Sequence, residues 1–170
     1  MLNKILIADD HSVVRSGIRN ILEDAYGRVD SDEACDGFEV LKKIRTATYD
    51  IVLMDISMPG KNGLDTLKDL KNICPSLPVL MLSIYPEQHY ALRSLRAGAS
   101  GYLQKTSAPE ELVRALNRIT DGGKYISPAV AEQMALYLDA DADKPPHESL
   151  SDREFEVLNL IAEGRSLGEI

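Results

Sequence analysis

Ile51-Val52-Leu53-Met54, followed at once by Asp55, is the stretch that decides the fold. Four apolar residues in succession, without alternation, indicate a strand that is covered on both faces, as in a parallel sheet. Two further runs of the same kind, Ile5-Leu6-Ile7-Ala8 and Val79-Leu80-Met81-Leu82, predict two more buried strands.

Amphipathic segments alternate with the strands. Their apolar residues recur with the 3.6-residue period of a helix, and they span residues 13–24, 38–45, 64–73, 87–97 and 109–120. Weaker strand patterns near residues 29–35 and 101–105 complete the alternation. Five strand–helix pairs predict a doubly wound α/β domain with a five-stranded parallel sheet. The carboxyl ends of its strands meet at one edge, where ligands of such sheets bind.

The composition bounds the class of protein. The chain has 170 residues, of which 44% are apolar and 27% charged, and this suits a globular domain with its own core. Apolar runs of at most five residues predict no transmembrane helix, and the N-terminus lacks the layout of a signal peptide. Two cysteines, Cys35 and Cys74, make no disulfide framework. We therefore expect a cytoplasmic protein with reduced thiols and no membrane partner.

The net charge of −8 is concentrated toward the C-terminus. Residues 123–170 carry 4 basic and 10 acidic side chains, whereas residues 1–122 carry 15 and 17. Nucleic-acid binding normally requires a basic face. We expect no sequence-specific DNA binding by residues 1–170 themselves.

The chain changes character after Gly122-Gly123, which ends the fifth helix. Ser127-Pro128 offers an N-cap and a first-turn proline for a sixth helix, whose apolar stripe is Val130, Ala131, Met134, Tyr137 and Leu138. Residues 139–147 are acidic, end in Pro-Pro-His and are typical of a linker. Ser151 to Glu154 forms a capping box for a helix with an apolar face of Phe155, Leu158, Ile161 and Ala162. A second capping box, Ser166 to Glu169, comes directly before the last residue, so we expect the chain to be cut inside a second domain.

Polar side chains follow the ends of the predicted strands. Asp9 and Asp10 follow the first strand, Asp55 ends the third, Ser83 ends the fourth and Lys105 ends the fifth. Because these ends meet at one edge, the sequence predicts a pocket of three carboxylates, one ammonium and one hydroxyl. Clustered carboxylates need a neutralising partner, and Mg²⁺ fits because it takes oxygen ligands and keeps several waters.

The chemistry that needs this set is phosphoryl transfer to a carboxylate. Asp55 is the best nucleophile because it stands alone on the middle strand, and a metal ion and Lys105 would offset charge on the phosphoryl oxygens. His11 is interpreted as a residue of the pocket rim, with a pH or metal role as the alternative.

The chain resembles bacterial two-component response regulators on the residues just described. Asp9-Asp10-His11, Leu53 to Gly60 with Asn62-Gly63, Leu82-Ser83, and Gly98 to Lys105 match the receiver pattern in order and separation. This resemblance covers roughly residues 3–121 and implies a flavodoxin-like receiver with strand order 2-1-3-4-5.

The resemblance implies a phosphoacceptor and a metal site. Asp55 resembles the phosphoacceptor. Asp10, Asp55 and the backbone carbonyl of Ser57 resemble the Mg²⁺ ligands, with Asp9 acting through water. The phosphoryl donor would be a cognate sensor histidine kinase or a small phosphodonor such as acetyl phosphate.

The resemblance also implies a switch. Ser83 resembles the hydroxyl residue that turns toward the phosphate, Lys105 the lysine that contacts it, and Tyr102 the aromatic residue that fills the space left behind. Such a protein is a phosphoacceptor and not an enzyme, with at most self-catalysed phosphorylation and slow autodephosphorylation, and activation is expected to favour a homodimer.

Leu150 to Gly164 resembles the opening of the LuxR-type helix-turn-helix of NarL/FixJ regulators. The expected domains are a receiver at residues 1–122, a helical and then acidic linker at 123–147, and the N-terminal part of the DNA-binding domain at 148–170, without its recognition helix. The intact protein would control transcription through that domain.

Two other functions compete with this interpretation. A receiver without an output domain would act by protein contacts alone, and residues 150–170 argue against it for the intact protein. A phosphatase of the haloacid dehalogenase type also uses a strand-end aspartate, but it needs a second aspartate two residues later, where this chain has Ser57.

Overall fold

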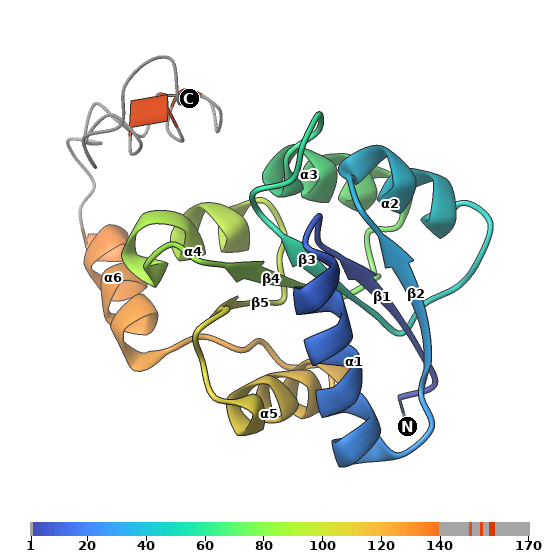
Figure 1. The fold of residues 1–170 in the computed structure, drawn as a ribbon. Helices are drawn as coiled ribbons and strands as arrows, with labels where there is room; N and C mark the ends of the chain where they lie inside the picture. Colours follow the sequence, from blue (N-terminus) through green and yellow to red (C-terminus); the bar gives the residue numbers. More distant parts are fainter. Residues whose placement is uncertain (1, 140–149, 151–153, 155–156, 159–170) are drawn as a thin grey trace. The chain divides into compact units, whose positions relative to one another are not determined.

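The computed structural model describes residues 2–139, 150, 154, 157 and 158. Its elements are β1 (Lys4–Ala8), α1 (Ser12–Tyr26), β2 (Asp30–Ala34), α2 (Gly37–Ile44), β3 (Ile51–Asp55), α3 (Gly63–Ile73), β4 (Val79–Ser83), α4 (Glu87–Arg96), β5 (Gly101–Gln104), α5 (Pro109–Thr120) and α6 (Pro128–Asp139). The five strands form one parallel sheet in the order β2-β1-β3-β4-β5. This confirms the doubly wound sheet and its strand order (Figure 1).

The apolar runs become the centre of the sheet. Every residue of β3 and β4 is buried, and in β1 only Lys4 is not. On one face, α1 and α5 pack side by side, and Leu22 and Leu116 join Ile5, Leu53 and Leu80 in one apolar core. Helices α2 and α3 pack against each other (Figure 1), and both have buried apolar residues. Continuous apolar runs are what a sheet covered on both faces requires.

The edge strand β2 explains why its sequence signal is weak. Only Ala34 of its five residues is buried, and the others include three acidic side chains. Arg15 and Arg19 pair with Glu33 at 2.6 and 2.9 Å. Charged residues protect an edge strand from pairing with other chains, so this strand lacks a hydrophobic pattern.

The connection from β3 to α3 is held by close backbone contacts. Asn62 caps α3 by accepting a hydrogen bond from the Asp65 backbone N–H at 2.8 Å. Gly63 lies against the end of β3, where a Cβ atom would collide with the carbonyl group of Asp55. The loop therefore has little freedom just after Asp55.

The sixth helix begins as the sequence predicts. Ser127 Oγ accepts a hydrogen bond from the Val130 N–H at 3.2 Å, so the expected N-cap is present. Val130 is buried and Ala131 is exposed, so within this chain the predicted stripe packs at Val130 and not at Ala131. The side chains of Tyr137 and Leu138 lie outside the described residues.

The chain divides into two compact units, Met1–Met134 and Ala135–Ile170. Glu154, Val157 and Leu158 are helical, in the stretch where a helix is predicted. Leu158, expected on its apolar face, is 43% exposed. The other members of that face, the linker at 140–147 and the capping residues Ser151, Ser166 and Glu169 lie outside the described residues. Among the described helices, none is long and apolar enough to cross a membrane.

Candidate functional site

The strand ends bring the predicted polar side chains to one edge of the sheet. Asp9 follows β1 directly, Asp55 and Ser83 are the last residues of β3 and β4, and Lys105 follows β5. The register pairs Asp55 with Leu82 and Ser83 with Gln104, so these strands end level with one another. Strands β3 and β4 each run one residue beyond their apolar run, which places both site residues inside the hydrogen-bonded sheet.

Lys105 joins the two buried carboxylates of the site. Its Nζ lies 2.6 Å from Asp9 Oδ2 and 2.7 Å from Asp55 Oδ2. The side chains of Asp9 and Asp55 are 1% and 3% exposed, and that of Lys105 is 12% exposed. One ammonium therefore faces two buried carboxylates.

Burial dominates the electrostatics of Asp55. Desolvation raises the pKa of Asp55 to about 6, although the hydrogen bond and charge of Lys105 lower it. Desolvation also opposes the charged form of Lys105, but Asp55 and Asp9 outweigh it and raise the pKa of Lys105. Lys105 is charged at neutral pH, and Asp55 is ionised above about pH 6.

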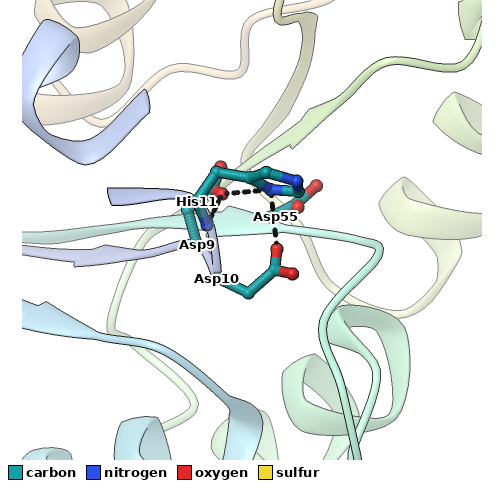
Figure 2. Close-up of side chains that lie close together, drawn as sticks. All are labelled: Asp9, Asp10, His11 and Asp55. Atoms are coloured by element: carbon teal, nitrogen blue, oxygen red, sulfur yellow. Dashed lines mark hydrogen bonds and ion pairs between the residues drawn. The ribbon is translucent and has the colours of Figure 1, made fainter. Parts of the chain in front are cut away.

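Asp10 and His11 lie at the solvent side of the same pocket. His11 Nδ1 is 2.9 Å from Asp10 Oδ1 and 3.2 Å from Asp9 Oδ1, and the His11 backbone N–H donates to Asp9 Oδ1 at 2.8 Å. Figure 2 shows the imidazole joined by dashed lines to both carboxylates, with Asp55 close by. His11 is exposed, as expected of a rim residue, yet it also touches the acidic pair. Adjacency in sequence is the only signal for that contact.

Ser83 and Tyr102 are both buried beside this edge. Ser83 Oγ accepts a hydrogen bond from the Tyr85 N–H at 3.0 Å, and the Tyr102 hydroxyl donates to the Tyr85 carbonyl at 2.8 Å. Burial raises the pKa of Tyr102. The rings of Tyr85 and Tyr90 stack with centroids 5.1 Å apart. Tyr85, whose backbone hydrogen-bonds both Ser83 and Tyr102, is not predicted from the sequence. Its position two residues after Ser83 is the only sequence feature that indicates such a contact.

Ser57 lies in the β3–α3 connection. Its backbone N–H hydrogen-bonds the Asp55 carboxylate and acts to lower the pKa of Asp55. The neighbouring turn is closed by hydrogen bonds from Met58 and Gly63 N–H groups to the Ile56 carbonyl, at 3.2 and 2.8 Å. The turn therefore holds the Ser57 backbone next to Asp55.

The donor set suits a hard divalent cation. One ligand atom from each of Asp9, Asp10, His11 and Asp55 lies within 4.8 Å of the others. The buried Oδ2 atoms of Asp9 and Asp55 have the Lys105 ammonium as their partner, at 2.6 and 2.7 Å, and no other donor of the described residues reaches them. Carboxylate oxygens in this number, open to solvent at Asp10, are the ligands that Mg²⁺ prefers.

Comparison with protein-family models matches residues 5–117 to the response regulator receiver domain. The chain is 39% identical to response regulator UvrY of Escherichia coli (strain K12) over 171 residues, covering 100% of this chain and 78% of that protein.

Two solved structures extend the similarity. A two-component response regulator of the LuxR family from Aurantimonas sp. SI85-9A1 superimposes with a TM-score of 0.73 at 34% identity, over 81% of this chain and 98% of the other. RcsB from Salmonella enterica serovar Typhimurium, bound to promoter P1flhDC, gives a TM-score of 0.72 at 28% identity, over 96% of this chain and 78% of the other.

Proposed function

The chain belongs to the family of two-component response regulators with a receiver domain, and on that premise we propose that Asp55 is its phosphoacceptor. The observation that carries the proposal is the buried Asp55 carboxylate, paired with Lys105 at 2.7 Å and grouped with Asp9 and Asp10 at the end of the sheet. An ionised Asp55 oxygen attacks phosphorus, the bond from phosphorus to the donor breaks, and an aspartyl phosphate forms.

Asp10, Asp55 and the Ser57 carbonyl would hold Mg²⁺, with Asp9 acting through water. The ion would supply positive charge for the phosphoryl oxygens. The side chains of this chain prepare the site: Asp10 is partly exposed and reaches solvent, while Asp9 and Asp55 are held by Lys105.

Lys105 moves from the carboxylate pair to a phosphoryl oxygen, because a dianionic phosphoryl group is a stronger partner for its ammonium. Ser83 gives up the Tyr85 N–H and turns its hydroxyl to another phosphoryl oxygen. Because Tyr102 is tied to the Tyr85 carbonyl, this movement changes the support of the Tyr102 ring, and the surface of α4 and β5 shifts between two states.

The phosphoryl donor is a cognate sensor histidine kinase, with acetyl phosphate as a small substitute. Self-catalysed phosphorylation and slow autodephosphorylation are the only reactions assigned to the chain. The family assignment does not favour the alternative of a phosphatase of the haloacid dehalogenase type. Similarity to UvrY along the whole chain does not favour the other alternative, a receiver that has no output domain.

Transcriptional control by the intact protein is exerted through its LuxR-type domain, as a DNA-binding homodimer in the cytoplasm. The promoter-bound structure of RcsB supports the DNA partner by similarity. In this proposal the receiver covers residues 1–122, the linker covers residues 123–147, and the DNA-binding domain begins at residue 148.

Intact-mass spectrometry after incubation with acetyl phosphate and Mg²⁺ tests the acceptor. One phosphoryl addition is expected, and it should be lost in Asp55→Asn and in EDTA. Asp24→Asn, which changes an exposed aspartate of α1, is the matched control and should still accept phosphate. Stoichiometric phosphorylation of Asp55→Asn would contradict the assignment.

A further inference from the structure

His11 places a nitrogen donor beside the acidic site. Its Nδ1 is 2.9 Å from Asp10 Oδ1 and 3.2 Å from Asp9 Oδ1. The His11 side chain is 65% exposed, so an ion arriving from solvent can reach it. In Figure 2 dashed lines join the imidazole to the Asp9 and Asp10 carboxylates, and Asp55 lies beside them.

These separations match the spacing of neighbouring ligand atoms around a divalent ion. Two ligands at right angles, each about 2.1 Å from an octahedral ion, lie about 3.0 Å apart. Two ligands of a tetrahedral ion at about 2.0 Å lie about 3.3 Å apart. The two N–O distances of His11 are close to these values, and the four ligand atoms of the cluster lie within 4.8 Å of one another, so the imidazole can exchange its hydrogen-bonded proton for an ion that it shares with the carboxylates.

We propose that His11 is a nitrogen ligand of this site and gives it a preference for a divalent transition-metal ion, such as Zn²⁺, over Mg²⁺. The inference rests on the proposed Mg²⁺ site, whose carboxylates it shares. Mg²⁺ takes oxygen ligands and keeps its waters, so an imidazole adds little to its binding. Imidazole suits Zn²⁺ and its neighbours in the first transition row. His11 is therefore the residue that separates the two classes of ion.

The histidines of the chain allow a clean test. The chain has three of them, so the double variant H89N/H147N keeps His11 as the only imidazole and serves as the reference protein. Adding His11→Asn then removes the proposed ligand. His11 is the N-cap residue of α1, and asparagine is a good residue there, so folding should be retained.

Calorimetric titration with Zn²⁺ and with Mg²⁺ measures both affinities. The reference protein should bind Zn²⁺ more tightly than Mg²⁺. The His11→Asn change should weaken the Zn²⁺ affinity at least about tenfold, the smaller loss seen when a residue supporting a metal ligand is removed, and should leave the Mg²⁺ affinity nearly unchanged. In the reference protein, Zn²⁺ should shift the ¹⁵N resonance of one ring nitrogen as direct metal coordination does, whereas Mg²⁺ should shift it only as far as the loss of its carboxylate partners does. Asp10→Asn should weaken both ions, because its carboxylate serves both.

A Zn²⁺ affinity unchanged by His11→Asn, or one that falls in parallel with the Mg²⁺ affinity, would overturn the inference. The two proposals fail in different ways. If the protein binds Mg²⁺ and its Zn²⁺ affinity does not depend on His11, this inference alone is wrong. If the protein binds Zn²⁺ through His11 and binds no Mg²⁺, the proposed Mg²⁺ site is wrong and His11 remains a ligand for the transition-metal ion.

Discussion

Lys105→Met should destabilise the metal-free protein strongly, and the cost should depend on pH. The variant keeps most of the length of the side chain but leaves two carboxylates, 1% and 3% exposed, without their ammonium. At an effective dielectric constant of about 20, a contact near 2.7 Å represents roughly 6 kcal/mol of gross attraction. Desolvation of Lys105 offsets part of this. Removing one partner of a buried ion pair costs about 3–5 kcal/mol, which is the loss expected at pH 8.

The sign of the pH dependence follows from Asp55. Its pKa in the folded protein, about 6, is already above that of an ordinary aspartate, because burial outweighs the lowering effect of Lys105. Removing Lys105 raises that pKa further. An acid whose folded pKa is raised destabilises the fold above that pKa, and the penalty disappears as pH falls and the carboxyl is protonated. The difference between wild type and variant should therefore shrink from pH 8 to pH 5.

Urea unfolding followed by far-ultraviolet circular dichroism, in EDTA, measures this difference at both pH values. The double variant D55N/K105M is the control; only Asp9 then lacks the ammonium of Lys105, so the double variant should lose clearly less stability than K105M. A K105M loss below about 1 kcal/mol at pH 8, or an equal loss at pH 8 and pH 5, would refute the electrostatic account of this pocket.

Three further predictions concern the scaffold. Gly63→Ala should cost about 1–3 kcal/mol in urea unfolding and slow phosphorylation, because its Cβ would meet the last carbonyl of β3; unchanged stability would contradict that collision. Leu53→Ala, at a fully buried position of β3, should cost about 2–5 kcal/mol by the same measurement. The hydrogen bond from Tyr49, and after it that from Lys4, lowers the pKa of Asp32 in the folded protein. Ionised Asp32 therefore stabilises the fold above its unfolded pKa of about 3.9, and this stabilisation is lost as pH falls through the lower folded pKa. Asp32→Asn should accordingly lower Tm at pH 7 with curves that converge at low pH; a gap that persists there would be inconsistent with it.

The sheet and most of the site could be predicted because both depend on backbone topology. Three uninterrupted apolar runs predict the central strands, and parallel strands place their carboxyl ends together whatever the side chains do. Asp55, Ser83 and Lys105 could therefore be grouped from position alone. The limits of the strands are less well defined by sequence: the fifth strand is predicted over residues 101–105, whereas β5 ends at Gln104 and Lys105 follows it.

The contacts that sequence reasoning missed depend on where side chains point. Tyr85 connects Ser83 and Tyr102 through its backbone N–H and carbonyl, which no residue pattern encodes. In the apolar stripe of α6, Val130 is buried and Ala131 is exposed within this chain, since a period of 3.6 residues gives a face only to within one position. Asp32 likewise accepts a hydrogen bond from the Tyr49 hydroxyl, 17 residues away in sequence, and local sequence propensities do not predict a contact at that separation.

The charges of the pocket explain how a single event can change several contacts. Lys105 faces two carboxylates, and His11 faces Asp9 and Asp10. Asp9 is common to both groups, so a cation or a phosphoryl group that draws either partner away also alters the other. The same edge carries Ser83, which is tied to Tyr102 through the backbone of Tyr85. We expect a change of charge at Asp55 to affect His11 by way of Lys105 and Asp9, and to affect Tyr102 by way of Ser83 and Tyr85; substitutions at His11 and at Tyr102 would separate the two effects.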